Sequence, residues 1–232
     1  EEMKSDFTNN ITHELKTPIA VAYAANDALL NFNQADEKAK RDKYLRICQE
    51  QLQRLSGLVE QILSMSMERR KTFRLHPEPL SMESILEPLI EQHKLKAEKP
   101  VHISTDIEPA GLTLTADRTH FGNIISNLID NAIKYSPEAA DVNIRCRQTA
   151  SAGQGEFVEI AISDRGTGIA PEKQSHIFDK FYRVPTGNLH NVKGYGLGLF
   201  YVKTMTEKHG GSVTVKSEPG KGSTFTLRFP NG

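Results

Sequence analysis

Three residues that could do chemistry, His13, Glu14 and Thr17, stand close together near the start of the chain, beside Pro18 in the stretch ITHELKTP. Histidine titrates near neutral pH, and its neutral imidazole is a nucleophile. His13 and Thr17 are four residues apart and would share one face of a helix. A proline inside a helix costs about 3 kcal/mol and removes a backbone hydrogen bond. The stretch is therefore either an unusual exposed helix or a chemical site.

Three asparagines recur at four-residue spacing in the stretch NIISNLIDNAIKYS: Asn123, Asn127 and Asn131. This spacing puts them on one face of a helix, although asparagine is a mediocre helix former. Amide oxygens suit Mg²⁺, which takes few protein ligands and completes its shell with water and phosphate. The sequence alone leaves two readings open, an exposed polar face and a row of ligands.

Asp164 follows the strand-like stretch VEIAIS and begins Asp-Arg-Gly-Thr-Gly. Its carboxylate could accept a hydrogen bond from an exocyclic amine, and glycines let the backbone approach a flat ligand closely. The alternative is an ordinary turn before a helix that starts near Pro171.

A second glycine-rich stretch, GYGLGL at 194–199, enters a helix, and such a junction is a ready anion site. It matches neither a Walker A loop, which needs Gly-Lys-Ser/Thr, nor a dinucleotide fingerprint. The polar, turn-rich residues 184–193 before it have the composition of a mobile lid.

The composition is that of an ordinary globular protein. The 232 residues carry 29 Lys and Arg and 29 Asp and Glu, so the net charge is zero. This balance argues against a nucleic acid or an anionic membrane as the main partner. Cys48 and Cys146 have no metal-like spacing, which favours a reduced, cytosolic setting. No apolar window of membrane-spanning length occurs, and the polar start is compatible with a fragment of a longer protein.

Residues 1–70 have helical composition. Apolar residues recur along a first helix at Phe7, Ile11, Leu15, Pro18, Ala22 and Leu29, and along a second at Leu45, Cys48, Leu52, Leu55, Val59 and Ile62. The polar stretch 31–36 between them is turn-like, so an antiparallel hairpin is expected. Such a hairpin buries little core alone, and self-association into a four-helix bundle is favoured over packing on the second half of the chain. His13 would face away from the packed stripe, with Thr17, Ala20, Ala24, Asp27 and Asn31.

After residue 70 the hydrophobic pattern alternates between strand-like and helix-like segments. Two prolines in KTFRLHPEPL predict a linker at 71–80. Strands are predicted at 101–107, 112–115, 142–147, 157–163, 213–216 and 224–229, and helices at 117–135, with Asp117 as the N-cap, and at 200–209. The tight turns between strands favour an antiparallel or mixed sheet with helices on one face, an α+β layer.

Six stretches in this order resemble the transmitter core of bacterial sensor histidine kinases: FTNNITHELKTP, NLIDNAIKYS, DRGTG, IFDKFYR, GYGLGL and GSTF. The resemblance covers essentially the whole chain. It implies a dimerisation and phosphotransfer hairpin at 1–70, forming a dimeric four-helix bundle, a linker at 71–80, and at 81–232 an α/β sandwich ATP-binding domain of the gyrase, chaperone and histidine kinase type.

The resemblance also implies roles for individual residues. In the hairpin, His13 would be the phosphoacceptor, Glu14 the acid beside it, and Thr17 the residue that supports a phosphatase reaction. In the second domain, Asn131 would bind Mg²⁺ with help from Asn127, and Lys134 and Arg183 would reach the phosphates. The nucleotide would be lined by Tyr135, Asp164, Gly166, Gly168, Ile169, Phe181, Gly194, Tyr195, Gly196, Leu197, Gly198, Leu199 and Thr224. Asp164 would bind the adenine amino group, and Phe178 and Phe181 would anchor the lid.

Tyr195 departs from the family pattern, in which this position is usually small or hydroxylated. Backbone contacts should survive this change, whereas the conformation of the lid and any hydroxyl contact there are in doubt.

The implied function is an autokinase that uses ATP and Mg²⁺, phosphorylates His13 and passes the phosphoryl group to an aspartate of a response-regulator receiver in trans. The presence of Glu14 and Thr17 adds an expected phosphatase activity toward that receiver. We expect a homodimer on the cytoplasmic side, in a parent protein anchored in the inner membrane through a region absent here. The alternatives are a net phosphatase of the same fold that uses ATP mainly for regulation, a nucleotide-gated dimerisation module, and a serine kinase.

Overall fold

The computed structural model describes residues 2–31, 38–67, 74–151, 155–180, 182 and 197–231. In the two N-terminal helices, it describes the side chains of residues 15–31, 38–52 and 55. The chain divides into two compact units, Glu1–Lys71 and Thr72–Gly232, and each is considered by itself.

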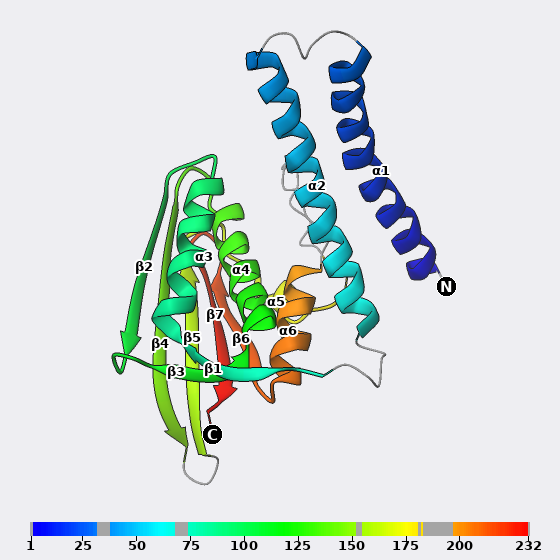
Figure 1. Ribbon diagram of the computed structural model, residues 1–232. Helices are drawn as coiled ribbons and strands as arrows, with labels where there is room; N and C mark the ends of the chain where they lie inside the picture. The colour runs from blue at the N-terminus through cyan, green and yellow to red at the C-terminus, as the bar shows by residue number, and fades with distance from the viewer. Residues whose placement is uncertain are drawn as a thin grey trace. The chain divides into compact units, whose positions relative to one another are not determined.

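The first unit is a helical hairpin of α1 (Glu2–Asn31) and α2 (Lys38–Met67) (Figure 1). Pro18 and Ala25 are buried on α1, as the apolar pattern predicts for the stripe that contains Pro18. On α2, however, Leu45 and Leu52 are 51% and 61% exposed. The hairpin therefore leaves part of its apolar pattern uncovered.

Helix α1 continues through Pro18 without a break. In the part of the chain that the structure describes, no helix is both long and apolar enough to cross a membrane.

The second unit is a five-stranded sheet covered on one face by helices (Figure 1). The strand order is β2-β4-β5-β7-β6, with β2 parallel to β4 and the other pairs antiparallel. The mixed sheet confirms the predicted layer. Its strands are β2 (Val101–Glu108), β4 (Ala140–Ser151), β5 (Gly155–Asp164), β6 (Ser212–Glu218) and β7 (Gly222–Pro230), and the helices of this unit are α3 (Met82–Lys96), α4 (Arg118–Lys134), α5 (Pro171–Gln174) and α6 (Gly198–Lys208).

The core lies between the sheet and the helices. Side chains of alternate strand residues point into it, including Val142, Ile144 and Cys146 on β4, because successive strand residues face opposite sides of a sheet. Burial raises the pKa of the Cys146 thiol to about 12. The thiol is therefore protonated at neutral pH, and it packs as a small apolar group.

Two elements depart from the predicted organisation. Strand β1 (Pro77–Ser81) lies in the segment predicted as a linker and pairs antiparallel with β3 (Thr113–Asp117) in a separate two-stranded sheet. Helix α3 was not predicted at all, since Pro88 interrupts its pattern. Its start nevertheless carries a readable signal, because the Ser81 side chain accepts a hydrogen bond from the Ser84 N–H as an N-cap.

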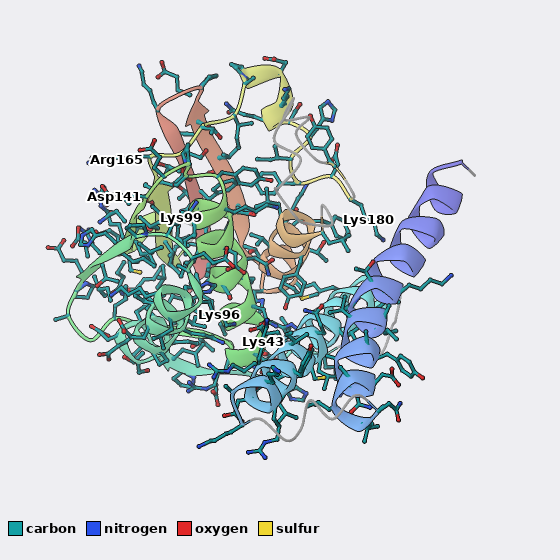
Figure 2. The ribbon with its side chains drawn as sticks, turned by 90° about the horizontal axis from the view of Figure 1, so that it is seen from above. Lys43, Lys96, Lys99, Asp141, Arg165 and Lys180 are labelled. Carbon is teal, nitrogen blue, oxygen red and sulfur yellow. The ribbon has the colours of Figure 1, made fainter. Side chains whose placement is uncertain are left out.

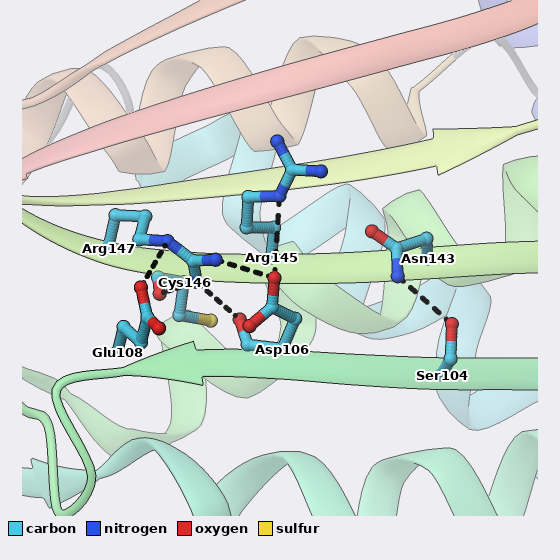
Figure 3. A network of polar contacts seen from close by, with 7 residues as sticks. All are labelled: Ser104, Asp106, Glu108, Asn143, Arg145, Cys146 and Arg147. Atoms are coloured by element: carbon cyan, nitrogen blue, oxygen red, sulfur yellow. Dashed lines mark hydrogen bonds and ion pairs between the residues drawn. The ribbon is translucent and has the colours of Figure 1, made fainter.

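Polar side chains join β2 to β4 on the sheet face that points away from the helices (Figure 3). Asp106 pairs with both Arg145 and Arg147, and Arg147 also pairs with Glu108. The hydrogen bond from Arg147 lowers the pKa of Asp106 despite some desolvation. These ion pairs connect the edge strand β2 to its parallel neighbour β4. They also place charges on the exposed sheet edge, which disfavours pairing with a strand of another molecule.

Candidate functional site

Helix α4 is capped as its sequence predicts. The Asp117 Oδ1 atom accepts the His120 N–H at 3.1 Å, and its Oδ2 atom accepts the His76 N–H at 2.9 Å. Burial alone would raise the pKa of Asp117, but these hydrogen bonds outweigh it and the pKa is lowered. The backbone N–H of Asp117 donates to His209 Nε2 at 3.1 Å, which fixes the helix start against the end of α6.

The face of α4 that carries the asparagines meets the start of α6. The Asn127 Nδ2 atom donates to the Asn123 carbonyl at 2.8 Å, so the amide orientation is set. The Asn127 Oδ1 atom lies 2.7 Å from where a Cβ at Gly198 would be. Within the described residues, the half-buried Asn131 side chain has no hydrogen-bond partner. Its amide oxygen is therefore available to a ligand.

The end of α4 adjoins the loop that follows β5. Lys134 Nζ lies 5.1 Å from the centre of the Tyr135 ring. The Tyr135 carbonyl accepts the Thr167 N–H at 3.0 Å and lies 2.5 Å from where a Cβ at Gly166 would be. A side chain at position 166 would break this junction, which holds the asparagine helix against the loop.

Asp164 ends β5 with one carboxylate oxygen fixed. Its Oδ1 atom accepts the N–H groups of Gly166 at 2.8 Å and Ser223 at 3.2 Å. In the described part of the chain its Oδ2 atom has no partner. Burial raises the pKa of Asp164, although both backbone hydrogen bonds favour the charged form. The residue presents one oriented, unpaired oxygen that could accept from an amine.

The glycines of this loop are needed by its own packing. Gly168 has φ +67°, and a Cβ there would lie 2.0 Å from the Glu218 carbonyl oxygen. At Gly222, which faces the loop from β7, a Cβ would lie 2.0 Å from the Asp164 carbonyl oxygen. The space beside Gly166 and Gly168 is thus taken by protein backbone, so the packing of the loop itself requires glycine at these positions. That the loop borders a base stays a prediction.

Thr224 lies on β7 directly opposite Ser163 of β5. Their hydroxyl groups are 2.9 Å apart and hydrogen-bonded. The next strand residue, Phe225, packs edge-on against Phe178 with ring centres 6.2 Å apart. Phe178 therefore packs against the core, and its role as an anchor of the lid stays a prediction.

The residues around the predicted lid fall into two groups. Leu197 is buried, Leu199 and Ile169 pack against the core, and Lys180 lies 5.2 Å from the Phe200 ring (Figure 2). Phe181, Arg183, Gly194, Tyr195 and Gly196 lie outside the described residues, as does the lid itself.

Arg165 lies between Asp164 and Gly166 in the chain, yet it takes no part in holding that carboxylate. It is 83% exposed and pairs with Asp141 at 3.5 Å (Figure 2).

His13 and Glu14 lie in α1, and their side chains are outside the described part. Thr17, one turn beyond His13, is exposed, and so are Ala20 and Ala24. The predicted face of small residues is therefore open to solvent in the hairpin.

Three residues near Asp164 were not singled out by the sequence: Gln174, Ser217 and Ser223. Only Ser223 lay within a quoted motif, GSTF. The other two bind backbone N–H and carbonyl groups of segments far apart in the sequence, and such contacts leave no pattern in a single sequence.

Comparison with known proteins agrees with this geometry. The family model for histidine kinase-, DNA gyrase B-, and HSP90-like ATPases matches residues 116–232, and that for the His Kinase A (phospho-acceptor) domain matches residues 3–70. The sensor protein RprX of Bacteroides fragilis is 36% identical over 99% of the chain, which spans 44% of the length of RprX.

Two solved structures are similar in fold. The mycobacterial sensor histidine kinase MprB is 26% identical with a TM-score of 0.56, covering 67% of this chain and 98% of that one. The histidine kinase ThkA, in complex with response regulator protein TrrA, has a TM-score of 0.65 at 21% identity and covers 98% of this chain and 61% of that one.

With its asparagine helix, its aspartate loop and the two matching family models, the chain belongs to the histidine kinase-, DNA gyrase B- and HSP90-like ATPase family and, joined to a His Kinase A phospho-acceptor domain, forms a sensor histidine kinase core.

Proposed function

We propose that this chain is an ATP-dependent protein-histidine autokinase that phosphorylates His13. The observation that carries the proposal is the junction of four separate segments at one place. Tyr135 joins α4 to the loop after β5, Asn127 meets Gly198 at the start of α6, and Ser223 of β7 holds Asp164. Each segment brings a residue type that a nucleotide needs.

The base would be read by Asp164. Its Oδ2 atom would accept a hydrogen bond from the adenine amino group, while Oδ1 stays fixed by backbone N–H groups. Thr224, paired with Ser163, would stand beside the base. The loop residues Gly166, Gly168 and Ile169 and the residues Tyr135, Phe181 and Gly194–Leu199 would line the rest of the nucleotide.

The phosphates would be met by Asn131, Lys134 and Arg183. The unpartnered amide oxygen of Asn131, near that of Asn127 on the same helix face, fits a hard cation that keeps water and phosphate oxygens as its other ligands. Mg²⁺ would neutralise charge on the triphosphate. Lys134 and Arg183 would orient the γ-phosphate, because phosphoryl transfer depends mainly on positioning and charge stabilisation.

In the transfer step, a lone pair on one imidazole nitrogen of His13 would form the N–P bond as the bond from the γ-phosphorus to the β,γ-bridging oxygen breaks and ADP leaves. Glu14 would accept a hydrogen bond from the other ring N–H and stabilise the cation that develops.

A homodimer through the hairpin is the second part of the proposal. Leu45 and Leu52 on α2, and Ile19, Tyr23 and Leu30 on α1, are large apolar side chains exposed in the single chain. A second hairpin would cover such side chains in a four-helix bundle. Residues 1–70 would then be the dimerisation and phosphotransfer domain, and the linker predicted at 71–80 would be shorter, since β1 begins at Pro77.

The phosphoryl group would pass to an aspartate of a response-regulator receiver that docks on the face of Thr17, Ala20 and Ala24. ThkA, which has the same fold, was crystallised with a response regulator. Thr17 would support the reverse removal of phosphate from that receiver. The parent protein, longer than this chain as RprX is, would be a membrane-anchored sensor with this region in the cytoplasm.

Incubation with γ-labelled ATP and Mg²⁺ tests the kinase. We expect a label that is stable in base, labile in acid, and lost in His13→Gln. Mixing His13→Gln with Asn131→Ala chains distinguishes labelling within a subunit from labelling of its partner, because only the second restores label in the mixed dimer. An acid-stable label on a hydroxyl would favour a serine kinase, and nucleotide binding without any label would favour a gated dimerisation module.

A further inference from the structure

We infer that the side chains of Gln174 and Ser217, here called the loop clamp, are positioning residues that hold Asp164 ready for the 6-amino group of adenine. The inference rests on the proposed function, since it concerns how the same site recognises its nucleotide. Neither residue would touch the nucleotide. Both would act through the backbone of the loop that runs from Asp164 to Ile169.

Gln174 fixes the far end of the loop. Its Nε2 atom donates one hydrogen to the Ile169 carbonyl and the other to the Ser217 carbonyl, each at 2.8 Å. A primary amide has two donor hydrogens, so both are used. The residue lies at the end of the short helix α5 and joins the loop to strand β6 through a single side chain.

Ser217 fixes the same end and extends the connection to β7. Its Oγ atom accepts the Ile169 N–H at 2.8 Å and donates to the Gly222 carbonyl at 2.9 Å. Since its one hydrogen is used there, the third contact, to Ser223 Oγ at 2.9 Å, must be donated by Ser223. The hydroxyl is fully satisfied and has one orientation.

This chain of contacts ends on the carboxylate of Asp164. Ser223, held by Ser217, is 7% exposed and donates its backbone N–H to Asp164 Oδ1. The loop is thus pinned at Asp164 by Ser223 and at Ile169 by the clamp. Between these two ends, Thr167 is held by the Tyr135 carbonyl at 3.0 Å and by the Gly220 N–H at 2.8 Å. The clamp therefore acts mainly on the part of the loop from Gly168 to Ile169, and glycine has the greatest backbone freedom of any residue type.

A pinned loop lowers the entropy that nucleotide binding must remove. Without the clamp, the loop would sample orientations in which the free oxygen of Asp164 no longer points at the amine. The consequence falls on recognition of the 6-amino group more than on the phosphates, which are bound by residues on α4 and near the lid.

The test compares ATP with purine riboside triphosphate, which lacks the 6-amino group, on the intact chain. In wild type we expect ATP to bind more tightly. Gln174→Met keeps length and removes both donors. It should weaken ATP binding by about tenfold, or about 1.4 kcal/mol, and weaken the analogue much less, so that discrimination between them shrinks. The KM for ATP should rise with kcat at saturating ATP nearly unchanged.

Ser217→Ala supplies a second variant and should shrink discrimination in the same way. Gln148→Met is the matched control, because that glutamine amide also donates a hydrogen bond but does so on the exposed far part of β4, to Glu156. It should leave both affinities unchanged. Thermal unfolding confirms that each variant is folded.

Equal loss of both nucleotides in the clamp variants, or no loss of either, would overturn the positioning role while leaving the proposed kinase intact. Wild type that binds neither nucleotide, or binds both equally, would overturn the proposed role of Asp164 itself and the clamp with it.

Discussion

The amide oxygen of Asn127 occupies the space into which any side chain at Gly198 would project, 2.7 Å from the position of its Cβ. The asparagine face of α4 and the start of α6 therefore fit together only because position 198 is glycine. This contact makes the spacing between the two helices part of the site.

Gly198→Ala should lower the free energy of unfolding by about 1–3 kcal/mol, the usual penalty for overpacking. Asn127→Ala in the same chain should remove most of this loss, giving a coupling energy of at least about 0.5 kcal/mol. Urea unfolding measures both. Gly122→Ala is the control, since nothing lies near a Cβ there and alanine favours the helix by up to about 1 kcal/mol. Simple additivity of the two substitutions would contradict the packing account.

Asp164→Asn should stabilise the fold at neutral pH while weakening ATP binding. Burial raises the folded pKa of Asp164, so the folded state keeps this proton to higher pH than the unfolded state does. The stability that this group contributes is fully present below the unfolded value of about 3.9 and is lost as the pH rises through the raised folded pKa. Asparagine accepts the same two N–H groups without charge.

The difference in urea midpoint between Asp164→Asn and wild type should therefore be largest at pH 7 and shrink toward pH 3.5. Calorimetry at pH 7 should show weaker ATP binding by about 1.5–3 kcal/mol, the range for a hydrogen bond to a charged group. A variant that is less stable than wild type at pH 7 would argue that the carboxylate charge is well compensated.

His209→Ala should cost about 1–3 kcal/mol of stability, the penalty for an unsatisfied buried donor. His209 Nδ1 donates to the Met205 carbonyl at 2.7 Å, which leaves Nε2 as the acceptor for the N–H of the buried Asp117. Urea unfolding checks the loss. His176→Ala, which removes an exposed pair with Asp179 and a tilted ring contact with Tyr182, should change stability by less than about 0.5 kcal/mol.

Leu52→Lys should shift the chain from dimer to monomer, because this exposed leucine lies on the apolar stripe of α2 and a two-fold interface feels each substitution twice. Loss of each buried leucine is worth about 1.5–3 kcal/mol. Sedimentation equilibrium gives the dissociation constant. Leu95→Lys is the control for placing a lysine at an exposed leucine outside the stripe. Leu95 is 86% exposed on α3, and this substitution should leave association unchanged.

Ala20→Arg or Ala24→Arg should slow transfer to the receiver by about tenfold, or about 1.4 kcal/mol, and spare labelling of His13. Both alanines are exposed on α1, so the larger side chain would block a docking partner without entering the hairpin core. Labelled phosphohistidine and its decay on addition of receiver report the two steps separately. Equal loss of both steps would contradict the docking face.

Local patterns predicted much of the fold. The N-cap at Asp117, the stripe through Pro18, and most of the strands follow from side-chain chemistry within a few residues. Helix α3 was not predicted, since a proline such as Pro88 destabilises a helix interior. Packing of Ile85, Leu86 and Ile90 in the core outweighs this cost of the proline. Strand β1 was not predicted because its pairing with β3 joins residues 32 to 40 positions apart, from Ser81 and Thr113 to Pro77 and Asp117, and the sequence of residues 71–80 showed only its prolines.

Some features of the candidate site could likewise be predicted from the sequence, and others could not. The residues that would touch the nucleotide stand in recognisable short motifs, because their identity serves the ligand. The reasons for the glycines at 166 and 168, and the existence of the loop clamp, depend on which backbone atoms the fold brings near them. The pattern of residues in one sequence does not reveal which backbone atoms the fold brings near these positions.

Strand β5 is the middle strand of the five, and Asp164 is its last residue. Amide hydrogens exchange last where a strand has paired neighbours on both sides, and opening that starts at the edge strands β2 or β6 must pass through β4 or β7 to reach it. Asp164, the residue proposed to recognise the base, is thus tied to the middle strand of the domain. Opening of the edge strand β2 would leave the proposed adenine contact in place, whereas opening of β6 would release Ser217 and with it the loop clamp.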